Sequence, residues 1–155
     1  MAACAVTAAA GGVARANTSH DGWPKIDGVL KINKDDGNDT MTGTGRSDEL
    51  LGGHGSDTIY GNDSADVLWG DYKPSGQGTK QFDHINGGPG NDFIYSSHGH
   101  NVIDAGPGND WIKAHYGYGK INCGGGNDIL YISHRAQKKY KLSGCEKITH
   151  KTLGF

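Results

Sequence analysis

The 155-residue sequence is poor in apolar side chains, since hydrophobic residues make up 34% of it and aromatic residues only 8%. Glycine, with 27 copies, is abundant, whereas proline occurs 4 times. This is too little apolar material for an ordinary layered core, so the fold needs a further source of stability. Scarce proline and the lack of a Gly-X-Y period exclude a collagen helix. A formal net charge of −2 argues against a basic nucleic-acid-binding surface.

Common catalytic and membrane signatures are missing as well. The sequence contains no G-x-S-x-G, H-E-x-x-H or P-loop pattern, and no stretch is long and apolar enough to span a membrane. We therefore predict no catalytic residue and no enzymatic activity. The 8 histidines are expected to be surface residues of polar turns. The alternative is that His98, His100 and His115, which fall in successive turns, gather around a zinc, copper or nickel ion.

The first sixteen residues, MAACAVTAAAGGVARA, differ in composition from the rest of the chain. They end in Ala14-Arg15-Ala16, a pattern typical of signal-peptidase cleavage, and predict a signal peptide at 1–16 and a secreted protein. The alternative is an alanine-rich disordered leader. Cleavage after Ala16 would leave the even pair Cys123 and Cys145, which in an exported protein indicates a disulfide rather than two buried thiols.

A nine-residue period organises most of the chain. Every ninth residue is aliphatic or methionine in two series: Ile32, Met41, Leu50, Ile59, Leu68, and then Ile85, Ile94, Ile103, Ile112, Ile121, Leu130. Aspartate stands two residues before most of them: Asp39, Asp48, Asp57, Asp66, Asp83, Asp92, Asp110 and Asp128. Chance does not produce such a series in a chain this poor in hydrophobic residues, so the period predicts a repeat architecture.

Two segments, GGHGSDTIY at 52–60 and GGPGNDFIY at 87–95, fit the nonapeptide G-G-x-G-x-D-x-U-x, in which U is a large apolar residue. Over about 31–132 the sequence therefore resembles the RTX (haemolysin-type) calcium-binding repeat family, as a small secreted bacterial member. The resemblance implies an all-β fold, a parallel β-roll or right-handed β-solenoid, with two nonapeptides in each coil. It also implies Ca²⁺ between stacked turns, with binding coupled to folding.

Turns eighteen residues apart lie on the same side of the roll, and how well each fits the glycine–aspartate pattern predicts where calcium binds. Strong turns end at Asp92, Asp110 and Asp128, which predicts two sites between them, whereas the intervening turns end at Asn101 and Gly119. By the resemblance, the metal ligands are these three aspartates and the turn residues Gly88, Gly90, Gly106, Gly108, Gly124 and Gly126, together with Asp39, Asp57 and Asp66 of the first half. Arg46, beside Asp48, argues against an ion at that turn.

The period breaks at 70–82, a segment with proline, glycine and no aliphatic residue, which we interpret as an inserted loop. If this loop occupies one turn, one outer sheet face is aromatic and the other polar, and five aspartates share a side: Asp48, Asp66, Asp92, Asp110 and Asp128. The aromatic face comprises Trp69, Phe93, Tyr95, Trp111 and Tyr131. Such a face predicts a binding surface for a glycan, a protein or a second copy of the chain. The alternative is that the C-terminal segment or the inserted loop covers it.

Both ends of the repeat region need covering, because an open roll exposes a strand edge. We assign 17–30 as an N-terminal lead-in or cap and 133–155 as a C-terminal cap, which is basic. A Cys123–Cys145 bridge would join this C-terminal cap to the last coil, an arrangement that resembles the endings of many secreted RTX-like proteins. The alternative is that the basic charge of this segment binds an anionic surface.

Overall fold

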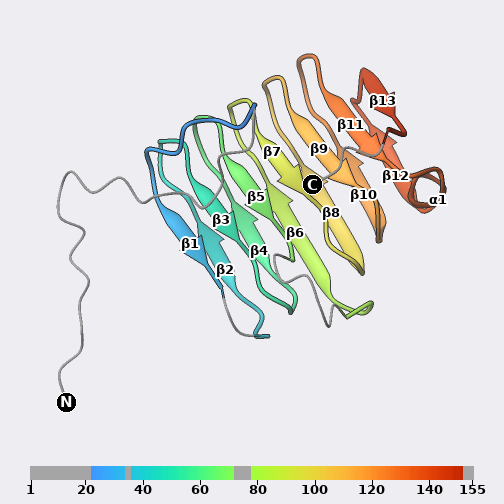
Figure 1. Ribbon diagram of the computed structural model, residues 1–155, viewed down its shortest axis with the longest axis horizontal. Coiled ribbons are helices and arrows are strands. Elements are labelled where there is room, and N and C mark those ends of the chain that lie inside the picture. Colours follow the sequence, from blue (N-terminus) through green and yellow to red (C-terminus); the bar gives the residue numbers. More distant parts are fainter. Residues whose placement is uncertain (1–21, 34–35, 72–77, 152–155) are drawn as a thin grey trace.

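The computed structural model describes residues 22–33, 36–71 and 78–151 (Figure 1). The predicted signal peptide, 1–16, lies outside the described residues. The chain forms two parallel sheets, to which successive strands contribute alternately. The first sheet contains β1 (Leu30–Ile32), β3 (Glu49–Leu51), β5 (Val67–Trp69), β7 (Phe93–Tyr95), β9 (Trp111–Ala114), β11 (Ile129–Ile132) and β13 (Lys147–Thr149). The second contains β2 (Thr40–Thr42), β4 (Thr58–Tyr60), β6 (Phe82–Asn86), β8 (His100–Asp104), β10 (Tyr118–Asn122) and β12 (Tyr140–Ser143).

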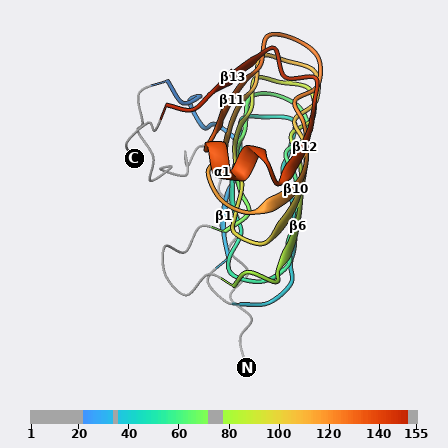
Figure 2. The same cartoon turned by 90° about the vertical axis from the view of Figure 1, so that its right-hand side faces the viewer.

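Seen along its length, the chain is a flattened coil whose two sheets face each other (Figure 2). Neighbouring strands within a sheet pair residues eighteen apart, as in Ile94 with Ile112 and Ile103 with Ile121. One coil therefore consists of two nonapeptides. The predicted all-β parallel β-roll is confirmed.

The core is the column of aliphatic residues predicted from the nine-residue period, except for Ile32, which is only partly buried and pairs with Leu51 instead of Leu50. The central side chains of the strands, such as Leu50, Ile94 and Ile121, have 0% exposure, and Met41 near the first coil has 8%. Side chains alternate between the two faces of a strand, so each short strand supplies one or two core residues. The core is thin, and the turns must share in holding the coils together.

The inserted loop adds length without changing the phase of the roll. Across it, Leu68 pairs with Ile94 and Ile59 with Ile85, each twenty-six residues apart instead of eighteen. The extra residues lie in the connection between β5 and β6, of which 72–77 are outside the described residues. Because the insertion occupies one turn, the turns before and after it remain stacked in register.

The C-terminal segment adds one strand to the end of each sheet. After α1 (His134–Gln137), whose N-cap Ser133 accepts a hydrogen bond from the Ala136 N–H, β12 pairs with β10 and β13 with β11. The turn from β12 to β13, residues 144–146, is three residues long, whereas the turn before β11, residues 123–128, has six. Among the described residues, no helix is long and apolar enough to cross a membrane.

Candidate metal-binding turns

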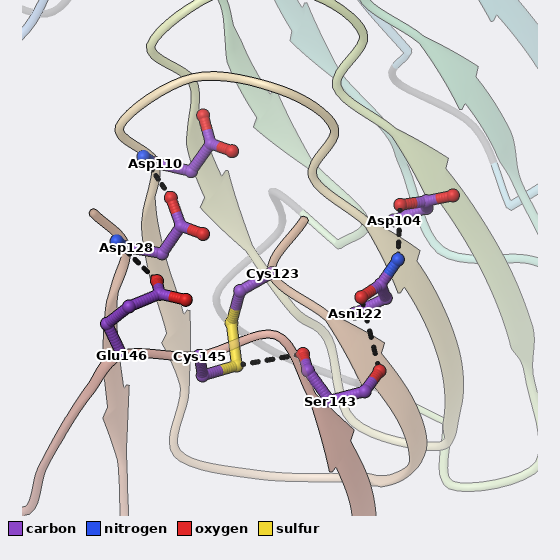
Figure 3. The surroundings of a disulfide bond; sticks show 8 residues. All are labelled: Asp104, Asp110, Asn122, Cys123, Asp128, Ser143, Cys145 and Glu146. Atoms are coloured by element: carbon purple, nitrogen blue, oxygen red, sulfur yellow. Dashed lines mark hydrogen bonds between the residues drawn. A yellow bond between two sulfur atoms is a disulfide. The ribbon is translucent and has the colours of Figure 1, made fainter. Parts of the chain in front are cut away.

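A column of carboxylates runs along one edge of the roll, which we call the aspartate edge. It consists of the turns that lead into the first sheet, and each turn ends in an acid: Asp48, Asp66, Asp92, Asp110, Asp128 and Glu146. The backbone N–H of each acid donates to the carboxylate of the next, with distances of 2.8 Å from Asp92 to Asp110 and from Asp110 to Asp128. Figure 3 shows the end of this column. The coils therefore bring together the acids that the sequence predicted to share a side.

In four of these carboxylates the second oxygen is buried and lacks a hydrogen-bond partner among the described residues. The Oδ2 atoms of Asp66, Asp92, Asp110 and Asp128 have no hydrogen-bond partner among the described residues, and all four aspartates are at most 1% exposed. Desolvation is the main cause that raises the pKa of Asp92 to about 8 and the pKa values of Asp66 and Asp110 to about 7. Neighbouring carboxylates of the column raise them further. Buried, unpaired anions of this kind are costly unless a proton or a cation neutralises them.

The glycine turns stack closely enough to bring backbone oxygens to the same edge. Gly106 has a φ of +103°, and a Cβ on it would lie 2.3 Å from the carbonyl oxygen of Gly88 in the preceding coil. Gly124 repeats the arrangement one coil later, where a Cβ would lie 1.7 Å from the Gly106 carbonyl oxygen. Only glycine combines this φ with so close an approach. The predicted ligand positions Gly88, Gly90, Gly106, Gly108, Gly124 and Gly126 all lie in these stacked turns.

The oxygen set fits a hard cation. Within residues 22–33, 36–71 and 78–151, no three His, Cys, Asp or Glu side chains converge as a metal cluster. An ion between two turns would therefore be held by aspartate oxygens together with turn carbonyls. Ca²⁺ accepts six to eight such oxygens in flexible geometry, whereas zinc prefers nitrogen and sulfur and Mg²⁺ demands a strict octahedron. When bound, the ion would neutralise the unpaired carboxylate charge.

The first turn of the aspartate edge differs from the others. Asp48 is fully buried, but its carboxylate accepts hydrogen bonds from the backbone N–H groups of Val29 and Thr44 and from the Thr44 hydroxyl. Arg46, which the sequence suggested as a substitute for the ion, is exposed. Hydrogen bonds from the turn and the lead-in thus stabilise Asp48, whereas Asp66 has an unpartnered oxygen.

The opposite edge begins with aspartates and continues without them. Asp39 donates its N–H to Asp57 and Asp57 donates to Asp83, both at 3.0 Å. In the next coil Asn101 takes this position; it is fully buried and its Nδ2 donates to the Tyr140 hydroxyl at 3.0 Å. Ser97, also buried, bonds to Asp83 and Asn101. Neutral groups here fill the place of a carboxylate.

Sequence reasoning overlooked an acidic group at the start of the inserted loop. Asp71 is buried, accepts a hydrogen bond from Gln81 and lies 3.8 Å from His54. Desolvation, followed by the charge of Asp83, raises the pKa of Asp71 to about 7. Asp71 lies outside the nine-residue period, so no repeat signal points to it.

The histidines of the opposite edge line a cavity. His98 and His115 border a cavity of about 560 Å³ near α1, and the His98 ring stacks on Tyr116 at 4.4 Å. Desolvation lowers the pKa values of both imidazoles. No group of three metal-ligating side chains occurs here or elsewhere in the described parts of the chain. The zinc, copper or nickel alternative therefore gains no support.

The predicted aromatic residues lie together on the outer face of the first sheet, which we call the aromatic face. Trp69 stacks on Tyr95 with ring centroids 4.2 Å apart, Phe93 on Trp111 at 5.7 Å, and Trp111 contacts Tyr131 at 4.8 Å. In addition, Trp23 of the lead-in packs over this row, and its Nε1 donates to the Tyr95 hydroxyl at 3.1 Å. Figure 1 shows the lead-in (blue) running along the roll between β7 and β1. The lead-in thus covers Tyr95, whose exposure is 6%.

Cys123 and Cys145 form a disulfide that joins the last six-residue turn to the cap. Next to Cys145, Glu146 accepts the Asp128 N–H at 3.0 Å and so continues the column (Figure 3). A backbone hydrogen bond from Asp128 is the main cause that lowers the pKa of Glu146. Desolvation raises the pKa of Asp128, and the adjacent Glu146 carboxylate raises it further. Glu146 was not predicted as a ligand, although it stands eighteen residues after Asp128 and two before Ile148, in phase with the repeat.

Comparison with known proteins supports the interpretation of the turns. The RTX calcium-binding nonapeptide repeat matches the chain in four copies, over residues 35–68 and 77–112. No curated protein and no solved structure matches the chain. The matched residues include four acids of the stacked column, Asp48, Asp66, Asp92 and Asp110, and the chain therefore belongs to the RTX calcium-binding repeat family.

Proposed function

We propose that the chain is a secreted β-roll protein that binds Ca²⁺ between its glycine- and aspartate-rich turns, and that binding drives folding. The observation that carries this proposal is the set of four stacked, buried aspartates whose Oδ2 atoms lack hydrogen-bond partners among the described residues: Asp66, Asp92, Asp110 and Asp128. The ligands we propose are Asp92, Asp110, Asp128 and the glycine carbonyls of their turns, with Asp66, Asp57 and Asp39 in the first half. We expect a structural role and no catalysis.

Folding and binding are coupled in this proposal because only the coiled chain brings the acids into a column. In the unfolded chain, Asp92 and Asp110 are separated by eighteen residues and fully hydrated, so no site exists. In the metal-free roll, the desolvated carboxylates repel one another and favour unfolding. An ion that binds only the folded state stabilises it in proportion to the logarithm of its concentration.

Secretion is supported by the covalent bond in the cap. Disulfides persist in oxidising, extracellular compartments and are rare in the cytosol. The Cys123–Cys145 bridge therefore agrees with the expectation of an exported protein that the N-terminal segment raised. Outside the cell, calcium would also be available to fill the turns.

Circular dichroism in EDTA, followed by calcium titration with magnesium as the control, tests the proposal. We expect strand signal and a cooperative thermal transition to develop with calcium but not with the same concentration of magnesium. A chain that is fully folded in EDTA and whose melting temperature ignores calcium would overturn the coupling. Localisation is tested separately, by assaying culture medium and cells for the expressed chain.

A second candidate function is recognition of a glycan, a protein or a second copy through the aromatic face. It is favoured by the continuous row of rings, of which Phe93, Trp111 and Tyr131 are partly exposed. Glycan-array binding that is lost in Trp111→Ala but kept in Tyr60→Ala, a control on the opposite sheet, would support it. Sedimentation of the same variants tests self-association.

A further inference from the structure

The carboxylate column does not end with the last nonapeptide. Glu146, in the short cap turn, accepts the Asp128 N–H just as Asp128 accepts the Asp110 N–H. Figure 3 shows Asp110, Asp128 and Glu146 one above another. The family match ends at residue 112, so this last step involves residues outside the matched repeats.

Between Asp128 and Glu146, as between the interior aspartates of the column, there is a buried carboxylate oxygen without a hydrogen-bond partner among the described residues. Asp128 is 0% exposed, and its Oδ2 has no hydrogen-bond partner among the described residues. The Glu146 Oε2 atom lies 3.0 Å from the backbone nitrogen of Asp128, so the two acids are neighbours. Two acids that lie together in this way form a place that a cation would stabilise.

The disulfide holds the cap turn in this position. Cys123 is fully buried at the start of the last six-residue turn, and Cys145 directly precedes Glu146. The cap turn has only three residues and cannot stack on its neighbour as one glycine turn stacks on another. Instead, Gly144 approaches Gly124, where a Cβ on Gly144 would lie 2.8 Å from the Gly124 carbonyl oxygen. The covalent bond between the two turns therefore fixes the place of the Glu146 carboxylate.

We propose that the cap forms a terminal calcium site between Asp128 and Glu146, held in place by the Cys123–Cys145 disulfide. This inference rests on the proposed function, because it assumes that the interior turns bind calcium. The terminal site differs from the interior sites in two respects: Glu146 is exposed, and the short turn offers fewer backbone carbonyls. Water completes the coordination of such a site, so it binds calcium more weakly than the interior ones.

Calcium stoichiometry of Glu146→Gln tests the site. Glutamine keeps an oxygen that accepts the Asp128 N–H and removes only the charge, so the cap turn keeps its hydrogen bond. We expect equilibrium dialysis with calcium to give one ion fewer per chain than in the wild type, with the loss confined to the weakest site. The matched control is Asp104→Asn, which removes a partly exposed charge of β8 that bonds to Asn122 outside the column. This control is expected to bind as many ions as the wild type.

A second variant tests the disulfide. In Cys123→Ala/Cys145→Ala we expect calcium affinity at the terminal site to fall by about 10-fold or more, as for supports that orient metal ligands. The interior sites should still be filled, as judged by strand signal at saturating calcium. Equal stoichiometry in Glu146→Gln and wild type would overturn the terminal site while leaving the proposed function intact. A wild-type chain that binds no calcium would overturn both.

Discussion

The two turn edges of the roll share one core but differ in how they satisfy their polar groups. On the aspartate edge, Asp92, Asp110 and Asp128 stack with an unpartnered oxygen in each coil among the described residues. On the opposite edge, the same ladder of N–H to carboxylate bonds ends at Asp83, and Asn101 continues in its place. There, Ser97 and Tyr140 supply hydrogen bonds.

On the function proposed above, this difference places the need for a cation in the turns and not in the coil itself. The aliphatic column is continuous beneath both edges, with Ile103 and Ile112 equally buried. An asparagine with three neutral neighbours satisfies a turn without an ion, whereas a stack of aspartates does not. On the function proposed above, the residue at one position of the nonapeptide determines whether a turn depends on calcium.

The largest effect should come from breaking the stacking of the aspartate edge. In Gly106→Ala, a side chain would combine a φ of +103° with a contact 2.3 Å from the Gly88 carbonyl oxygen. We expect a loss of about 3 kcal/mol in unfolding free energy, from the unfavourable φ and the overpacking together. Urea unfolding in calcium measures it. The control is Gly125→Ala, since a Cβ there meets nothing within 4 Å; an equal loss in both variants would contradict the stacking argument.

Exchanging asparagine and aspartate between the two edges is expected to change the free energy of unfolding by a smaller amount. Asn101→Asp places a carboxylate at a fully buried position beside Asp83, where it loses the hydrogen bonds that the Nδ2 of Asn101 donates. We expect about 2 kcal/mol of destabilisation in EDTA. The reciprocal change, Asp110→Asn, keeps an acceptor for the Asp92 N–H and removes a buried charge. It should stabilise the metal-free roll by about 1 kcal/mol and lower the calcium stoichiometry.

Urea unfolding of both variants, with and without calcium, separates the outcomes. If calcium stabilises Asn101→Asp above the wild type, the opposite edge can bind the ion once its aspartate is restored. That result would show that the residue at this position alone distinguishes the edges. If Asp110→Asn loses stability in EDTA as well, the column does not carry the unneutralised charge that we infer.

Sequence periodicity predicted the features that repeat and missed those that do not. The column of Ile94, Ile103 and Ile112 follows from spacing alone, because a nine-residue period with one apolar position determines which side chain points inward. The stacking of Asp66 on Asp92 across the insertion was also foreseen, on the condition that the loop occupies one turn. Both predictions depend on the constant nine-residue spacing and not on the identity of every residue in the repeat.

The residues that were missed lie where the period changes or ends. Glu146 was overlooked because a three-residue turn replaces a six-residue one, although its spacing to Asp128 is still eighteen. Trp23 covers the aromatic face from the lead-in, which has no repeat to place it. Asp71 lies at the start of the inserted loop. In each case, tertiary contacts between unrelated segments decide the position, and a period cannot encode them.

The stability of the metal-free roll should depend on pH because of the buried carboxylates of the aspartate edge. In EDTA the pKa values of Asp66 and Asp110 are about 7 and that of Asp92 about 8, against 3.8 for an ordinary aspartate. Between the ordinary and the raised pKa values, the folded chain holds protons that the unfolded chain has released. The free energy of unfolding therefore falls as pH rises from about 4 and is lowest above about 8. We expect the melting temperature to be higher at pH 5 than at pH 8 by at least about 5 °C.

Calcium should reverse this trend, because the ion and the proton compete for the same carboxylates. With calcium present, melting temperature is expected to rise with pH over the same window. Scanning calorimetry in EDTA and in calcium compares the two directly. A metal-free roll that becomes more stable as pH rises would contradict the assignment of desolvated acids on the aspartate edge.

The smallest expected change in the free energy of unfolding comes from substitutions on the outer faces of the two sheets. Trp23→Phe removes the hydrogen bond from Nε1 to the Tyr95 hydroxyl but keeps an aromatic ring over the aromatic face. The loss of one bond to a buried hydroxyl should cost about 1 kcal/mol or less in urea unfolding. Tyr60→Phe is the control, since Tyr60 is 38% exposed on the second sheet, and we expect no change. Because burial raises the pKa of Tyr95, spectrophotometric titration gives a second readout. If the lead-in covers this face, a larger truncation, Trp23→Ala, should let Tyr95 ionise at lower pH, and an unchanged titration would show that the lead-in does not shield it.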